Sequence, residues 1–301
     1  MIKIHPFLML VLAFGALAGR WLELVTLFTL VLIHEWGHAV CARALGWNVQ
    51  SIVLMPFGGA LQVIPPPLAP PWHEFVIALA GPLTHVPLIV LGWILTDLKL
   101  WSQAMGQFWF EGNMMIFMFN MLPLFPLDGG RMVLALLTRI IPYRMALMSI
   151  YGWTLFLSVL MTLLIIGVPH VGYVLKGSLS ALLLLPYVLT ISLTAFNDLQ
   201  HTMHRFFLER YMYHETVRMW RVRKVQVKGH WTMRCALRRM YRSFYHIYER
   251  ESVYDPKRRM LDGQKRCYPQ EETNILSLYF LSGRANLTFD QWEDEHCHSS
   301  R

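Results

Sequence analysis

The chain has 301 residues, of which 55% are hydrophobic and only 15% are charged. A single soluble core does not need that much apolar surface, so the composition excludes an ordinary soluble enzyme and indicates a polytopic membrane protein. Residues 1–196 hold 8 Lys and Arg and 6 Asp and Glu, whereas residues 197–301 hold 19 and 13. The net charge of +8 therefore indicates a basic tail beside an anionic membrane surface and argues against nucleic-acid binding.

Six apolar runs are long enough, or nearly long enough, to cross a bilayer. They cover about 6–19, 21–45, 74–96, 108–127, 146–167 and 172–196. The first run is short and ends like a signal-peptidase site, but Arg20 favours a tight hairpin into the second run, so we expect the first run to be retained. Basic residues gather on one side of the runs, which places both chain termini in the cytoplasm.

The second run contains HEWGH, residues 34–38, within an otherwise apolar segment. On a helix, the spacing of four puts His34 and His38 on one face, where both imidazoles can bind one zinc ion. Glu35 then lies where it can take a proton from water at that metal. Ionisable groups within a span are costly and usually functional, so the sequence predicts a metal site. A hydrogen-bonded pair of interhelical histidines is the alternative.

The segment VQSIVLMPFGGALQVIPPPLAPP follows, with alternating apolar residues that break at Gly58 and Gly59 before a proline-rich stretch from Pro65 to Pro71. This pattern predicts a short membrane-associated β-hairpin with an open edge and then an extended loop. A plain connector is the alternative. An open strand edge could receive an extended peptide by strand addition.

A catalytic zinc usually takes three protein ligands, so a third ligand is expected outside HEWGH. The fourth run ends in FNMLPLFPLDGGR, where Asp128 is the only Asp or Glu between Glu111 and Asp198. Prolines weaken the helix before Asp128, and we expect Gly129 and Gly130 to release the backbone after it, so that the carboxylate can turn toward a neighbouring helix. Turn capping is the alternative role.

Three other polar residues in the runs each have two interpretations. Asn120 could stabilise an oxyanion or hold a substrate backbone, or it could bridge two helices. His85, in AGPLTH, fits either an interhelical hydrogen bond or a role at the site. Cys41, three residues after His38, is expected to pack as a small residue, although it could compete as a ligand.

The tail begins with a mixture of aromatic and basic residues over 197–224, which predicts an amphipathic linker helix leaving the membrane. Beyond it, KVQVKG alternates like a strand, and WTMRCALRRMYRSFYHIYE has apolar residues at helical spacing before another short strand. A last helix is expected over about 271–281. Residues 225–301 should therefore form a small α+β domain.

At this point the sequence resembles a known family. HEWGH and NMLPLFPLDGG resemble the site-2 protease family of intramembrane zinc metalloproteases, and LMPFGGALQV, AGPLTH, FLERY and NILSLYFLSGRAN resemble its sporulation branch. The resemblance covers nearly the whole chain. It implies one zinc per chain held by His34, His38 and Asp128, with Glu35 as general base.

The same resemblance implies where a substrate binds. It places Asn120, Pro126 and Phe57 near the bound peptide, beside the hairpin edge at Gly58 and Gly59. The implied substrate is the membrane-associated pro-form of the mother-cell sigma factor K. The implied inhibitory partners are stage IV sporulation protein FA and the bypass-of-forespore protein.

In this family the tail carries a regulatory module of the cystathionine-β-synthase (CBS) type that binds ATP. The tail here is short for the usual paired repeats, so ATP binding is left open and pairing of two subunits through the tail is expected. The expected architecture is an all-α polytopic membrane protein. It has a six-span metalloprotease domain over 1–196 with its β-hairpin, a linker helix over 197–224, and a CBS-type cytoplasmic domain over 225–301.

The expected activity is that of an intramembrane zinc endopeptidase in the mother-cell membrane. A membrane ion transporter or metal sensor that uses His34, His38 and Asp128 as an ion site is the alternative. Glu35 separates the two, because replacing it with Gln should stop turnover by a protease while leaving its zinc in place.

Overall fold

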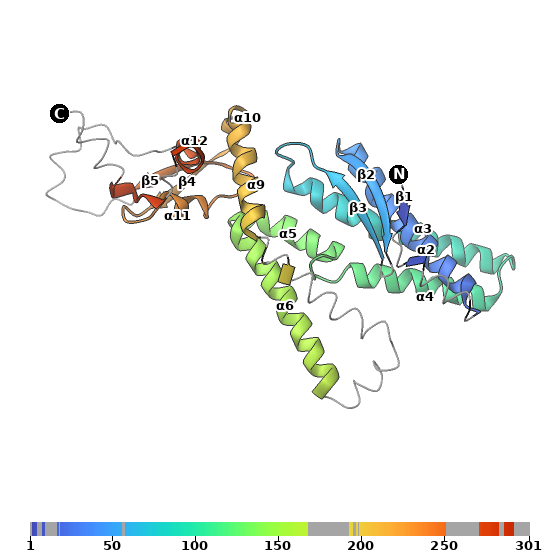
Figure 1. Cartoon of the computed structure of the whole chain (residues 1–301). Helices are drawn as coiled ribbons and strands as arrows, with labels where there is room; N and C mark the ends of the chain where they lie inside the picture. The colour runs from blue at the N-terminus through green and yellow to red at the C-terminus, as the bar shows by residue number, and fades with distance from the viewer. Residues whose placement is uncertain are drawn as a thin grey trace, which may run out of the picture. The chain divides into compact units, whose positions relative to one another are not determined.

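The computed structural model describes residues 2–4, 8–9, 17, 19–55, 58–167, 193–194, 197, 199–250, 271–282 and 286–291 (Figure 1). Two units can be distinguished. The first combines Met1–Leu136 with Met148–Asp198, and the second combines Leu137–Leu147 with Leu199–Arg301. The predicted first and sixth spans lie almost entirely outside the described residues, and so does Phe57.

Long apolar helices make up most of the first unit. α2 (Trp21–Ala44), α3 (Pro71–Asp97) and the Tyr143–Leu160 part of α6 (Tyr143–Gly167) are each long and apolar enough to cross a membrane. They coincide with the predicted second, third and fifth spans. The chain is therefore a membrane protein, while the count of six spans stays a prediction.

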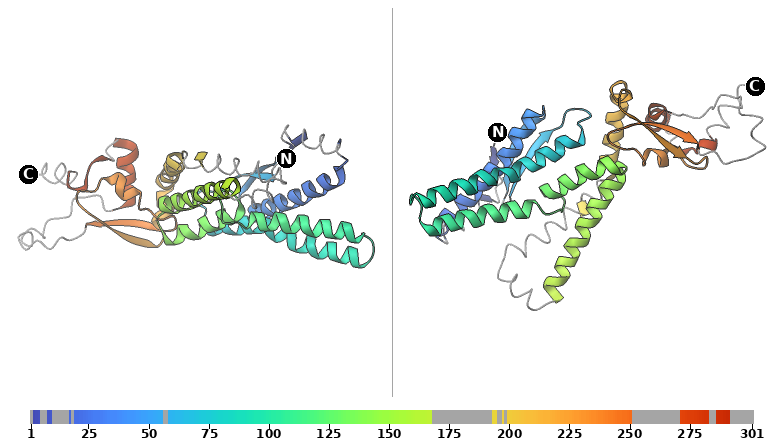
Figure 2. Two further views of the ribbon diagram at one scale, coloured as in Figure 1. Left: turned by 90° about the horizontal axis from the view of Figure 1, so that it is seen from below. Right: turned by 180° about the vertical axis from the view of Figure 1, so that it is seen from behind.

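α4 (Gln103–Asn120) runs back along α3 as an antiparallel partner, as Figure 2 shows. Its first turn is capped by Ser102, whose hydroxyl accepts a hydrogen bond from the Met105 backbone N–H at 3.2 Å. Farther along the pair, the Trp109 indole N–H donates to the Leu88 carbonyl at 2.7 Å. α2 packs against both helices, so α3 and α4 enclose the polar face of α2.

The predicted fourth span, 108–127, is wrong over its last seven residues. α4 ends at Asn120, residues 121–127 form a loop, and a separate helix, α5 (Asp128–Ile140), begins at Asp128. Prolines in this loop cannot donate backbone hydrogen bonds and so end the helix early. The loop is held by Thr154 of α6, whose hydroxyl accepts from the Phe125 backbone N–H at 2.9 Å.

The expected role of the two glycines after Asp128 is also corrected. Gly129 and Gly130 do not release the backbone, because both lie in the first turn of α5. A Cβ atom at Gly129 would lie 2.4 Å from the Leu122 carbonyl oxygen, and one at Gly130 would lie 2.4 Å from the backbone of Leu124. Glycine is therefore required for the loop to pack closely on the start of α5, which fixes Asp128.

The predicted hairpin is present as β2 (Asn48–Met55) and β3 (Gly58–Ile64), which pair antiparallel with Met55 opposite Gly58. A third strand, β1 (Ile2–Ile4), was not predicted, and it pairs parallel to β2 with Ile2 opposite Ile52. The sheet order is β1-β2-β3. Among the described residues, β3 has β2 as its single neighbour, so its other edge is open there.

The hairpin packs on α2 through two groups of buried apolar side chains. In the first, Ile52 and Leu54 of β2 pack with Ala39 of α2. In the second, Ala42 and Trp47 pack with Ala69, in the loop before α3, and with Ile77 of α3. The sheet is therefore fixed against the helix that carries HEWGH.

The second unit contains α9 (Leu199–Met212), α10 (His214–Arg218) and a small α+β arrangement. The latter comprises β4 (Val222–Val227), α11 (Met233–Leu237), β5 (Tyr245–Arg250), α12 (Glu272–Ser277) and the one-turn π-helix η2 (Leu278–Ser282). β4 and β5 pair in parallel. The strand, helix and strand follow the predicted order, although α11 ends at Leu237. The CBS-type assignment stays a prediction.

A buried polar cluster holds α9 to this arrangement. The guanidinium of Arg210 on α9 is 1% exposed and forms an ion pair with Glu272 on α12. It also donates to the Arg242 carbonyl at 3.2 Å. His246 of β5 completes the cluster, with its Nδ1 2.7 Å from Glu272 Oε2. FLERY, the motif that contains Arg210, thus helps to build the core of the second unit.

Candidate metal centre

Three side chains from α2 and α5 converge on one buried point. His34 and His38 lie one turn apart on the buried face of α2 and are each 3% exposed, and Asp128 at the start of α5 is 7% exposed. Asp128 Oδ2 lies 3.0 Å from His34 Nε2 and 3.1 Å from His38 Nε2, and the two Nε2 atoms are 3.1 Å apart. The structure therefore brings together all three predicted metal ligands.

The three atoms fit a zinc ion in spacing and in chemistry. Ligand atoms about 2.0–2.1 Å from a tetrahedral zinc are separated by about 3.3 Å, close to the spacings here. His38 Nδ1 lies 2.6 Å from the Ile77 carbonyl, which can accept but not donate, so the proton is on Nδ1 and the lone pair of Nε2 points at the cluster. Within the described residues, Asp128 has the two histidines as its ion-pair partners and no Lys or Arg.

Glycines in α2 and α3 keep the space around the imidazoles free. A Cβ atom at Gly81 of α3 would lie 2.2 Å from His38 Nε2 and 2.8 Å from His34 Nε2. Gly37, inside HEWGH, lets α2 approach α3, since a Cβ there would lie 2.8 Å from the Ala80 carbonyl oxygen. Larger side chains at either position would displace the ligands or separate the helices.

Glu35 lies beside the ligands on α2, 7% exposed, and faces the hairpin. A Cβ atom at Gly59 would lie 2.2 Å from Glu35 Cγ and 2.7 Å from its Oε1. The start of β3 is therefore in direct contact with the Glu35 carboxyl group. A peptide backbone near this part of the sheet would be close to the Glu35 carboxyl group and to the three candidate ligands.

The other predicted site residues are not gathered at the ligands. Asn120, the last residue of α4, donates from Nδ2 to the Ile116 carbonyl of its own helix at 3.0 Å, and within the described residues it has no hydrogen bond to a second helix. Pro126 is half-buried in the loop before Asp128. Cys41 packs against the cluster that contains Ala42 and Trp47 and is not among the three convergent ligands.

Two buried polar residues extend the site away from the ligands. His85 of α3 is fully buried, and its Nε2 lies 3.1 Å from His34 Nδ1. Its Nδ1 lies 2.9 Å from Oδ1 of Asn113 on α4, which is also fully buried. The sequence left the role of His85 open between two interpretations and did not single out Asn113. An Asn inside the predicted fourth span was the available indication.

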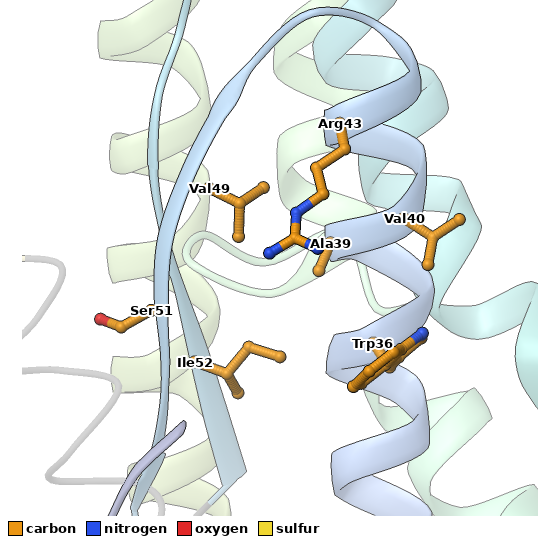
Figure 3. Close-up of a pocket in the computed structure, with 7 residues that line it drawn as sticks. All are labelled: Trp36, Ala39, Val40, Arg43, Val49, Ser51 and Ile52. Atoms are coloured by element: carbon orange, nitrogen blue, oxygen red, sulfur yellow. The ribbon is translucent and has the colours of Figure 1, made fainter. Parts of the chain in front are cut away.

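A separate cavity of about 260 Å³ lies between α2 and β2 (Figure 3). Trp36, Ala39, Val40 and Arg43 line its helix side, and the Arg43 guanidinium extends toward the strand. The strand side is formed by Val49, Ser51 and Ile52. No predicted metal ligand lines this cavity, so it is not part of the convergent site.

Comparison with known proteins identifies related chains. The family model described as Peptidase family M50 matches residues 22–101, which include HEWGH. Stage IV sporulation protein FB of Bacillus subtilis is 35% identical over 211 residues, which are 70% of this chain and 71% of that protein. A zinc metalloprotease of Methanocaldococcus jannaschii is 30% identical over 118 residues, 38% of this chain and about a third (34%) of the relative.

Two further similarities are weaker. The putative zinc metalloprotease Rip3 of Mycobacterium tuberculosis is 38% identical over 121 residues, which cover 38% of this chain and 30% of that protein. Among solved structures, the site-2 protease from Methanocaldococcus jannaschii matches with a TM-score of 0.46 at 22% identity, over 64% of this chain and 89% of that one.

Proposed function

Because this chain belongs to the site-2 protease family, peptidase family M50, and is a membrane metalloprotease, we propose that it cleaves a membrane-associated precursor at the centre formed by His34, His38 and Asp128. The observation that carries the proposal is the convergence of three ligand atoms within 3.1 Å of one another, beside a buried Glu35. An ion transporter or metal sensor is not favoured, since the relatives are named as metalloproteases.

The residues have distinct roles in this proposal. Bound zinc would supply a Lewis acid that polarises the scissile carbonyl and makes water a better nucleophile near neutral pH. Glu35 takes a proton from the attacking water while the water oxygen bonds to the carbonyl carbon. Glu35 then delivers that proton to the amide nitrogen as the C–N bond breaks. The balance is one water consumed and two peptide ends released.

The hairpin is the proposed substrate platform. A helical substrate hides its carbonyls in its own hydrogen bonds, so the peptide must be extended before attack. The open edge of β3 could pair with such a peptide by strand addition, and contact between Gly59 and Glu35 supports delivery of the peptide at that point. Gly58, Phe57, Asn120 and Pro126 are proposed to contact the substrate around it.

We further propose pro-sigma-K as the substrate, with stage IV sporulation protein FA and the bypass-of-forespore protein as inhibitory partners, since the relative with 71% of its length matched is a stage IV sporulation protein. Both termini are then cytoplasmic, in the mother-cell membrane that surrounds the forespore. Pairing of subunits through the tail is part of the same proposal.

The test is cleavage of tagged pro-sigma-K by purified wild type and by Glu35→Gln, with zinc measured in each preparation. The proposal expects processing by the wild type alone and about one zinc per chain in both. Cleavage of an unrelated membrane-tethered peptide but not of pro-sigma-K would reject the substrate and leave the chemistry standing. Equal cleavage by both enzymes would reject Glu35 as the base.

A second proposal concerns ATP and the tail. The second unit holds a cavity of about 430 Å³ whose basic lining residues are Arg144, His201, His204, Arg234 and Arg238. Among the described residues, no acidic side chain lines it, and arginines in such a setting suit a phosphate-bearing ligand. We propose that ATP binds in this cavity.

Equilibrium ATP binding to the purified full chain tests this proposal. Arg234→Ala combined with Arg238→Ala should weaken binding at least tenfold, as expected for the loss of charge-assisted bonds to phosphate. Lys228→Ala, an exposed basic residue of the same unit outside the cavity lining, is the control and should bind as the wild type does. Absence of ATP binding by the wild type would reject the proposal that this cavity binds ATP.

A further inference from the structure

A hydrogen-bonded chain connects the metal centre with two helices that supply no ligand. It runs from His34 on α2 to His85 on α3, then to Asn113 on α4 and the backbone of Trp109. His85 and Asn113 are fully buried, so their polar atoms depend on partners within the protein. Burial of both polar groups would be costly without the hydrogen bonds.

The donor and acceptor of each hydrogen bond in this series can be assigned by starting from the Trp109 carbonyl. The Trp109 carbonyl can only accept, so the group that faces it at 2.8 Å is the Asn113 NH₂, and Asn113 Oδ1 must face His85. An oxygen acceptor 2.9 Å from His85 Nδ1 requires a proton on that nitrogen. In neutral His85, Nε2 then carries a lone pair and faces His34 Nδ1 at 3.1 Å.

The same reasoning fixes the tautomer of His34. Because His85 Nε2 accepts, His34 Nδ1 must donate, and the lone pair of His34 is on Nε2. That nitrogen is the atom that lies 3.0 Å from Asp128 Oδ2 and 3.1 Å from His38 Nε2. The amide of Asn113 is therefore oriented so that His34 presents a lone pair, and not a proton, to the metal centre.

We propose that His85 and Asn113 are positioning residues that hold His34 in its metal-binding tautomer and ring orientation. This inference rests on the proposed zinc function and gives His85 and Asn113 a supporting role in zinc binding. His38 has its own orienting partner in the Ile77 carbonyl, so each of the two histidines is held by a different hydrogen-bonding group of α3. A partner of this kind for a metal-bound histidine supports metal affinity as well as activity.

Zinc affinity is the readout, measured by chelator competition on the purified full chain with saturating zinc as the starting state. His85→Phe keeps a ring of similar size but cannot accept from His34, and it should lower zinc affinity by about 10–100-fold. His85→Gln can accept from His34 through its carbonyl oxygen and donate to Asn113 through its NH₂, so it should recover most of that loss. Asn113→Leu should lower affinity in the same direction and by a smaller factor.

Thr96→Val is the matched control. Thr96 is on α3 where that helix packs against α4, and its hydroxyl donates to the Gly92 carbonyl within the helix, away from the ligands. Its loss should leave zinc affinity unchanged. If His85→Phe does not fold, Asn113→Leu and His85→Gln carry the comparison.

The outcomes separate this inference from the function beneath it. Unchanged zinc affinity in His85→Phe and Asn113→Leu, with zinc-bound wild type, would overturn the positioning role and leave the proposed protease intact. Equal losses in His85→Phe, His85→Gln and Thr96→Val would also overturn it, because only packing would then matter. Absence of zinc from the wild type would instead reject the proposed metal function.

Discussion

The two units each bury a carboxylate and at least one histidine, yet they resolve the charge in opposite ways. In the tail, Glu272 is paired with the guanidinium of Arg210 and with His246, so the cluster neutralises itself. At the candidate metal centre, Asp128 faces two imidazoles, and the hydrogen bonds behind those rings direct their lone pairs toward it. The first cluster balances its own charge, whereas the second brings three ligand atoms together at a point that suits a metal cation.

The difference also separates the expected consequences of mutation. A self-neutralised ion pair that loses one partner leaves an uncompensated buried charge, which reduces stability. A ligand set that loses its geometry gives up its ion, and activity disappears while the helices can stay packed. Changes in the two units should therefore produce different losses, and each prediction below tests that separation.

The largest effect is expected for Gly81→Ala. The new Cβ would lie 2.2 Å from His38 Nε2, so the imidazole must leave its place in the ligand group. Zinc per purified chain should fall to near zero, and cleavage should be abolished. Gly152→Ala is the control, because a Cβ there meets nothing within 4 Å. Normal zinc content in Gly81→Ala would contradict the ligand geometry.

Gly59→Ala should separate chemistry from metal binding. Its Cβ would lie 2.2 Å from Glu35 Cγ, so the carboxyl group must shift while the three ligands keep their positions. Misplacement of a catalytic group by about 1 Å costs on the order of 100-fold in rate, and we expect a loss of that size in kcat. Zinc content should remain that of the wild type. Wild-type turnover would show that the hairpin does not position Glu35.

Glu272→Gln tests the tail cluster. Removing the charge leaves the Arg210 guanidinium buried without its carboxylate, at an expected cost of about 3–5 kcal/mol to the stability of the second unit. Hydrogen exchange of tail amides in the full chain should rise accordingly, with zinc content unchanged. Glu249→Gln, from a pair with exposed Lys224, is the control and should have little effect. Zinc loss in Glu272→Gln would show that the two clusters are not independent.

A smaller effect is expected from acid. Burial lowers the pKa of His246, and the charges of Arg210 and Arg223 lower it further, although its hydrogen bond to Glu272 opposes the shift. Burial would raise the pKa of Glu272, but the charge of Arg210 and hydrogen bonds from Arg210 and His246 outweigh burial, so the net pKa is lowered. Both groups then bind protons more readily in the unfolded chain.

The sign of the pH dependence follows. Stability of the second unit should fall as the pH drops below 6.5 through His246, and again below 4.5 through Glu272. Each group contributes at most about 1.4 kcal/mol per pH unit. Hydrogen exchange of the tail, corrected for intrinsic rates, is the measurement. His246→Asn should remove the decline that begins near 6.5, and persistence of that decline would assign it to another group.

Local patterns in the sequence predicted part of this account. Helical spacing in HEWGH predicted two ligands on one face, and alternation with two glycines predicted the hairpin. Asp128 was predicted as the third ligand because it is the single acidic residue in a long apolar region. Each depends on residues close together in the chain or on a chemical requirement for a third ligand. These parts of the site are encoded locally.

The remainder depends on contacts between distant segments. The pairing of β1 with β2 joins residues about 50 positions apart, and no periodicity predicts it. The link from His85 to Asn113 crosses between helices, so burial alone could not assign it. The expectation that Gly129 releases the backbone fails because its neighbour in space, the Leu122 carbonyl, is identified only once the loop folds back on α5.

The most direct test of the central claim is X-ray absorption at the zinc edge on purified Glu35→Gln, together with zinc per chain. The account predicts about one zinc, with nitrogen and oxygen ligands at about 2.0–2.2 Å and an imidazole signature from His34 and His38. A sulfur ligand at about 2.3 Å would place Cys41 in the site, and absence of zinc would contradict the assignment of His34, His38 and Asp128 as zinc ligands.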